Sequence, residues 1–228
     1  MSVLRVLPAL LSAAGGEWDN GVCSPTSDVC FYGETPAAGL ISGNDLLTLI
    51  GASAAGTKHN SNVTWLRVAA GGQKLYIAQK TILYGVSIGT LRALGLLSLT
   101  GQVVSIGGKT FRVRTLCGSI SNPWSGGAWA ADPSHQYGCE WNKIMYRLYG
   151  GGGVSGEGIP YGELAKYSAA ELGLLGDETP GSRTLLVANN TNNYGLFRGT
   201  WGPMGHSYGT IIGAPSARGY RPVLQLIE

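Results

Sequence analysis

The chain has 228 residues, 44% of them hydrophobic and 13% charged, so it can bury a core and is not compositionally disordered. Its formal net charge of +3 comes without a run of Lys or Arg, which argues against nucleic acid as a partner. No stretch approaches the roughly 20 apolar residues that span a bilayer. The 37 glycines are about twice the average share and predict turn-rich β structure. So few charges favour a homo-oligomer or a larger assembly.

The first part of the chain differs from the rest. Residues 1–62 hold short apolar pieces without sustained alternation, and we expect them to form an arm that docks on neighbouring subunits. The apolar run at residues 6–11 is short and contains Pro8, so a cleaved signal peptide is not expected.

One short helix is predicted within this arm. Asn44 is placed to cap a helix over residues 45–50, and Gly51 is placed to end it. Residues 56–62 have the composition of a connector, so we place the boundary between the arm and a compact domain, residues 63–228, at residue 62.

The region from residue 63 to residue 116 predicts two β-hairpins with a helix between them. Each hairpin has two β-type runs around a Gly-Gly pair, which suits a tight turn. The helix has apolar side chains on one face, which should pack on the sheet. In chain order the elements are strands at 63–68 and 74–78, a helix at 88–94 capped by Ser87, and strands at 102–106 and 109–116.

A third helix has the clearest pattern in the chain. Residues 140–148 place four apolar side chains on one stripe, which predicts that these side chains are buried: Trp141, Ile144, Met145 and Leu148. Further on, Ser168 and Glu171 have the spacing of a capping box for a short helix that Gly173 ends.

The remaining strands are predicted in the last fifth of the chain. Runs of β-type residues lie at 184–188, 195–198 and 221–227, separated by loops rich in Gly, Asn and Pro. We expect the strand over residues 221–227 to tie this end of the chain into a sheet.

Four blocks then allow a comparison with a known family. They are Trp65 to Val68, Gly108 to Arg114, Glu140 to Tyr146, and Gly219 to Leu224. In this order they resemble a domain that recurs in virion proteins of tailed phages, often at the C-terminal end of tail-fibre or appendage proteins. The resemblance covers residues 63–228. It implies an α+β, mainly β, C-type-lectin-like domain, Gly-rich and built from hairpins with two or three short helices.

The end of the chain carries a related likeness. Arg198 to Trp201 and Ser216 to Arg221 resemble the closing segment of C-type-lectin-like folds, including the formylglycine-generating enzymes and phage variable tail proteins. We interpret Arg198 and Arg221 as framework residues that donate hydrogen bonds across loops. The enzyme branch depends on reactive cysteines near the C-terminal end, whereas Cys139 is the last cysteine here, so that activity is not implied.

The four cysteines form two candidate pairs. Cys23 with Cys30 would close a small loop, and Cys117 with Cys139 would bridge the loop before the third helix. Buried thiols are the alternative for each pair. A particle assembled in reducing cytosol can oxidise after release, so the even count does not imply secretion.

The sequence predicts neither a metal site nor a cofactor. His59, His135 and His206 are far apart and lack metal-binding spacing. Asp132 and His135 share one loop, and without a nearby nucleophile we interpret them as surface residues. The calcium-binding motifs of sugar-binding C-type lectins are missing.

Aromatic residues in loops are the remaining candidates for a binding surface. Such rings stack on sugars or anchor protein interfaces, although they can also roof a core that is poor in regular structure. The candidates are Trp124, Trp129, Tyr137, Tyr194, Trp201 and Tyr208.

Together these patterns predict a structural, non-enzymatic component of a tailed-phage virion, as a tail, collar, fibre or capsid-decoration protein assembled in the host cytoplasm. Its expected partners are other virion proteins and copies of itself, with no nucleic acid and no membrane insertion. The alternative is a receptor- or glycan-binding module that contacts a host surface glycan or protein, with Trp124, Trp129 and Trp201 in contact. A secreted enzyme is a third reading, which the missing nucleophile, metal set and carboxylate pair argue against.

Overall fold

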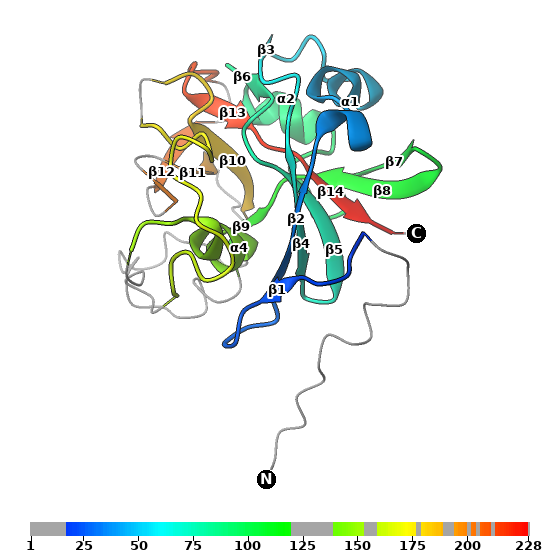
Figure 1. Ribbon diagram of the computed structural model, residues 1–228. Coiled ribbons are helices and arrows are strands. Elements are labelled where there is room, and N and C mark those ends of the chain that lie inside the picture. Colours follow the sequence, from blue (N-terminus) through cyan, green and yellow to red (C-terminus); the bar gives the residue numbers. More distant parts are fainter. Residues whose placement is uncertain are drawn as a thin grey trace.

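The computed structural model describes residues 17–119, 139–152, 159–176, 179–188, 194–199, 202–203, 206–210 and 213–227 (Figure 1). Within these residues the protein has two β-sheets and a few short helices. The expected α+β, mainly β class is therefore confirmed.

The first sheet is antiparallel throughout. Its strands follow the order β1-β2-β4-β5-β14-β8-β7. The bounds are β1 Val22–Cys23, β2 Cys30–Thr35, β4 Trp65–Ala70, β5 Gln73–Ala78, β7 Gln102–Ile106, β8 Lys109–Arg114 and β14 Val223–Leu226.

The second sheet is mixed. Its main path follows the order β12-β11-β10-β13-β6-β3, with β9 also paired to β10, and the β10 pairings with β13 and β9 are parallel. The bounds are β3 Thr57–Lys58, β6 Leu83–Tyr84, β9 Cys117–Ser119, β10 Arg183–Ala188, β11 Tyr194–Arg198, β12 His206–Thr210 and β13 Arg218–Tyr220.

Two neighbouring chain segments pass from one sheet into the other. Strand β13 belongs to the second sheet and β14 to the first, and only Arg221 and Pro222 separate them. Beside them, β5 continues into β6 in the same way. Backbone hydrogen bonds from Ala78 N to Pro222 O (3.0 Å) and from Ile82 N to Tyr220 O (2.9 Å) hold the two crossings together. The sheets are therefore joined by a continuous two-stranded ribbon.

Both predicted hairpins are confirmed. Strands β4 and β5 are joined by Gly71 and Gly72, and β7 and β8 by Gly107 and Gly108. All four glycines have positive φ angles, between 56° and 79°. A two-residue turn of this kind matches the natural twist of an antiparallel pair, and glycine adopts it without a steric penalty.

The helices are short and carry their expected apolar faces. Their bounds are Gly43–Leu49 (α1), Ile88–Ala93 (α2) and Glu140–Leu148 (α4), with a 3₁₀ turn at Ala37–Gly39. Helix α2 has the predicted cap, because the Ser87 hydroxyl accepts a hydrogen bond from Thr90 N at 3.0 Å. The prediction for α1 was wrong by two residues: Ser42 caps it through Asp45 N, and Asn44 lies inside the helix.

The strands of the first sheet carry buried side chains on both faces. Trp65 and Tyr76 belong to one apolar cluster, and the adjacent residues Leu66 and Ile77 belong to the other. Because side chains alternate along a strand, the two clusters lie on opposite faces of the sheet. Helices α1 and α2 cover the first cluster, and α4 covers the second (Figure 1). The predicted stripe of α4, Trp141, Ile144, Met145 and Leu148, is fully buried.

The expected arm is not a separate unit in the part of residues 1–62 that the structure describes. Strand β2 lies between β1 and β4 in the first sheet, and Trp18, Leu46 and Leu47 are buried in the same cluster as Trp65. Strand β2 was not predicted because it lacks regular alternation. A register irregularity between Phe31 and Glu34, where Gly33 has a φ of 87°, interrupts the alternation. Described residues on both sides of residue 62 thus share one sheet and one core cluster, and residues 1–16 lie outside the described residues.

The capping box at Ser168 forms, although on a single turn and not on a helix. Ser168 N and Oγ both donate to the Glu171 carboxylate, at 2.7 and 2.8 Å, and Glu171 N donates back to Ser168 Oγ. Gly173 follows with a φ of 65°, which ends the turn as expected.

Candidate functional site

The structure describes few of the aromatic candidates. Trp124, Trp129, Tyr137 and Trp201 lie outside the described residues, as do Asp132 and His135. Tyr194 begins β11 opposite Thr210, and Tyr208 lies in β12 opposite Leu196. The backbones of these two tyrosines thus run along adjacent strands at one edge of the second sheet.

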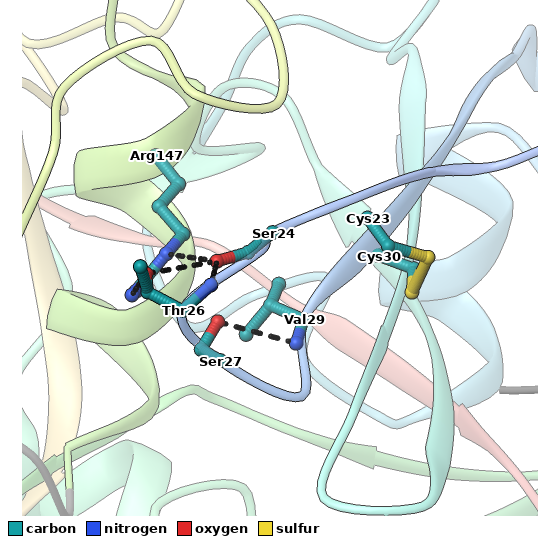
Figure 2. The surroundings of a disulfide bond; sticks show 7 residues. All are labelled: Cys23, Ser24, Thr26, Ser27, Val29, Cys30 and Arg147. Atoms are coloured by element: carbon teal, nitrogen blue, oxygen red, sulfur yellow. Dashed lines mark hydrogen bonds between the residues drawn. A yellow bond between two sulfur atoms is a disulfide. The ribbon is translucent and has the colours of Figure 1, made fainter. Parts of the chain in front are cut away.

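The first predicted disulfide is present. Cys23 and Cys30 are opposite residues of β1 and β2, and they are joined through sulfur (Figure 2). The loop that they close is bound to helix α4, because Arg147 Nε donates to Ser24 Oγ at 3.2 Å and Arg147 Nη2 contacts Thr26 Oγ1 at 3.5 Å. The disulfide therefore closes this loop, and Arg147 binds the loop to α4.

The second predicted disulfide is not formed. Cys117 and Cys139 are both buried thiols. The Cys139 thiol instead donates to the carbonyl oxygen of Cys117 at 3.2 Å, so this side chain is directed at backbone and not at sulfur. Burial raises the pKa of the Cys139 thiol, which disfavours the reactive thiolate.

Arg221 is a framework residue, as the sequence suggested. Its side chain is fully buried at the crossing between the sheets, and it donates to Thr184 Oγ1 (3.0 Å), Ala78 O (3.1 Å), Leu172 O (2.5 Å) and Gln79 O. Its guanidinium lies 5.8 Å from the ring centroid of Trp141. With these neighbours the guanidinium has no open face for a ligand.

Glycine allows this close packing at two of the predicted positions. A Cβ on Gly219 would lie 2.7 Å from the Cγ2 atom of Thr81, and a Cβ on Gly199 would lie 2.7 Å from the carbonyl oxygen of Ser182. Near Gly199, the Arg198 side chain is buried and its Nη1 contacts the Tyr146 hydroxyl at 3.4 Å. These residues serve the fold.

Two partly buried ion pairs also belong to the framework. Arg114 makes a bidentate pair with Glu140, at 2.6 and 2.7 Å, and the same carboxylate accepts a hydrogen bond from Cys117 N at 2.8 Å. Arg147 pairs with Glu163 at 2.8 Å. Each pair ties α4 to another segment, so these charges hold elements together.

A polar hollow of about 400 Å³ lies where the loop before β4 meets the end of β5, and it is the candidate binding site. It is lined by Asn60, Ser61, Asn62, Val63, Thr64, Gln79 and Lys80.

The walls of this hollow are fixed by hydrogen bonds. Gln79 N donates to Thr64 O at 2.8 Å, which links the two walls. Asn60 adopts a positive φ of 48° and its amide donates to Thr81 O at 2.9 Å, while Gly43 N donates to Ser61 O at 2.8 Å. The loop is thus held on both sides by the sheet and by α1.

His59 lies beside the hollow and is used by the fold. Its Nε2 is 3.0 Å from Thr81 Oγ1, and its ring packs edge-on against Tyr84. Burial lowers the pKa of His59, so the neutral imidazole is favoured at neutral pH. Among the described residues, no group of three or more His, Cys, Asp or Glu side chains could hold a metal ion.

Sequence reasoning missed this hollow. Residues 56–62 have the composition of a connector, and Gln79 and Lys80 follow a strand without any recognisable motif. Only the pairing of β4 with β5 brings the two segments together. The sequence signal that could have indicated it is the set of polar residues just before β4 and just after β5.

Comparisons with protein-family models, with curated proteins and with solved structures all gave no significant match. None of the helices in the described ranges is long and apolar enough to cross a membrane.

Proposed function

We propose that the chain is a structural, non-enzymatic component of a tailed-phage virion that acts through assembly with copies of itself and with other virion proteins. The proposal includes a C-type-lectin-like character for the domain. It begins from the four sequence blocks that resemble phage virion domains, and the fold supplies two supporting observations.

The main support is that the four blocks are neighbours in space. They fall on β4, on β8 with its turn, on α4, and on β13 with β14. Strand β14 pairs with β8 and, through β5, reaches β4. Arg114 of the second block pairs with Glu140 of the third, and Arg221 of the fourth lies against Trp141. Matches that form one framework favour a shared domain over a set of chance similarities.

A second support is the edge strand β7. Its residues, Gln102 to Ile106, include neither a charge nor a proline, and the Val103 side chain is 61% exposed. Natural sheets protect free edges with charges, prolines or covering segments, because an open edge pairs with other chains. In the described part of the chain β7 pairs with β8 alone. Such an edge suits a protein that is covered by neighbours in an assembly.

The location of the chain tests this proposal directly. Mass spectrometry of particles purified from cells that carry the encoding genome should find the chain in a fixed ratio to the other particle proteins. Immunogold labelling should then place it at one site on the particle. A chain that stays in the soluble fraction while particles lack it would refute the proposal.

A receptor- or glycan-binding role is the second candidate function. The polar hollow favours it, because it collects amide, hydroxyl and ammonium groups at the surface. Binding of the isolated chain to host cells or to a glycan array, lost when residues of the hollow are changed, would support this role. Binding that instead depends on Trp124, Trp129 or Trp201 would support a different surface for it.

A further inference from the structure

Most polar side chains of the hollow are not used by the fold, unlike the buried arginines of the framework. Arg114, Arg147 and Arg221 are all taken up by hydrogen bonds within the chain. By contrast, five polar side chains of the hollow make no hydrogen bond or ion pair with any described residue: Ser61, Asn62, Thr64, Gln79 and Lys80. They converge from two segments on one space and remain available to a ligand.

The hollow has a positive charge. Lys80 is its one charged lining residue. Outside the lining, hydrogen bonds from the amide and hydroxyl of Ser168, together with the charge of Lys80, lower the pKa of Glu171. Beneath the wall, the guanidinium of Arg221 donates to the carbonyl oxygen of Gln79. With Lys80 as the one charged lining residue and no lining carboxylate, the hollow favours a ligand with negative charge.

The lining also defines the rest of the ligand. Val63, its one apolar residue, is only 3% exposed, so the hollow offers little to an apolar molecule. Amides and hydroxyls suit a ligand with many hydroxyl groups, since each can donate and accept. The volume of about 400 Å³ is near the lower end of the range for small-molecule sites. One or two sugar units would fit, with part of the ligand open to solvent.

We propose that this hollow binds an acidic saccharide, with Lys80 on the carboxylate of a uronic-acid-type sugar and with Asn62, Thr64 and Gln79 on its hydroxyl groups. The proposal rests on the second candidate function and is independent of whether the chain is built into a particle. It assigns the contact to the hollow and not to the loop aromatics.

The test compares two matched sugars on the purified full chain. Amide chemical shifts are recorded by NMR during titration with sodium glucuronate, with glucose, and with sodium acetate. We expect glucuronate to bind in the millimolar range and to shift the amides of residues 60–64, 79 and 80. Glucose should bind more weakly at the same residues, and acetate should leave them nearly unchanged.

Variants then separate the charge from the hydroxyl contacts. Lys80→Met should weaken glucuronate binding about tenfold or more and remove the preference over glucose. Asn62→Ala should weaken both sugars alike. Lys166→Met, which changes an exposed lysine away from the hollow, is the matched control and should bind as the unchanged chain does.

Three results would overturn the proposal. They are the absence of glucuronate shifts in the hollow, shifts that Lys80→Met does not affect, and shifts that acetate reproduces, which would mean an adventitious anion only. Failure of this test leaves the particle measurement untouched, and absence from particles leaves this test untouched, so the two proposals fail separately.

Discussion

Replacing Arg221 tests the argument that one buried guanidinium joins the two sheets. In Arg221→Met, three backbone carbonyls and the Thr184 hydroxyl lose their donor in the interior. A buried polar group left without its partner costs about 1 kcal/mol or more, which sums to about 4 kcal/mol. Burial lowers the pKa of Arg221 to about 9, so the guanidinium carries a desolvation cost that Met avoids. We expect a net loss of about 3 kcal/mol in the free energy of unfolding.

Urea unfolding, followed by Trp fluorescence, measures this loss. For a chain of this length it corresponds to a melting temperature lower by about 6 to 12 °C. Arg92→Met removes an exposed arginine from the end of α2 and should change stability by less than about 1 kcal/mol. Arg221→Lys should lie between the two, because one ammonium cannot reach acceptors on both sides of the crossing. If Arg221→Met were as stable as Arg92→Met, the role assigned to Arg221 would be wrong.

Three other predictions concern separate parts of the fold. Changing Cys23 and Cys30 together to Ser should cost about 2 kcal/mol, measured by thermal melting, and reductant should lower the melting temperature of the unchanged chain but not of this variant. Gly118→Ala would place a Cβ 2.6 Å from the Cδ2 atom of Leu196 and should cost about 1 to 3 kcal/mol in urea; a neutral result would contradict the packing. Burial raises the pKa of Glu17, but hydrogen bonds from Lys109 and Tyr76 outweigh it and hold the pKa below its usual 4.5. The stability advantage over Glu17→Gln should therefore be full above pH 4.5 and should disappear as pH falls through the folded-state pKa. An advantage that grows as the pH falls would contradict this account.

The elements predicted correctly from sequence were those whose signal is local. Helix α4 has its whole apolar stripe within nine residues, and its bounds match the prediction. The β4–β5 and β7–β8 hairpins were predicted from Gly-Gly turns between alternating runs. The elements that were missed depend on distant partners. Strands β6 and β13 are two and three residues long, and they are strands only because they pair with each other and with β3 and β10.

The candidate site could not be predicted for the same reason. Asn62 comes before β4 and Lys80 comes after β5, and neither residue is part of a motif. What brings them together is the pairing of β4 with β5, a property of the folded chain. The loop aromatics were chosen by residue type, and for Trp124 and Trp129 that choice stays a prediction.

The position of β13 and β14 has a consequence for how the chain folds during synthesis. Both strands have neighbours on each side: β13 lies between β10 and β6, and β14 lies between β5 and β8. All other strands in the described ranges leave the ribosome earlier, so each sheet is split by a gap until residues 218–226 emerge. The nascent chain must hold two incomplete sheets with exposed inner edges, which is the condition under which chaperones are needed. One insertion event then closes both sheets, and folding should be abrupt and late.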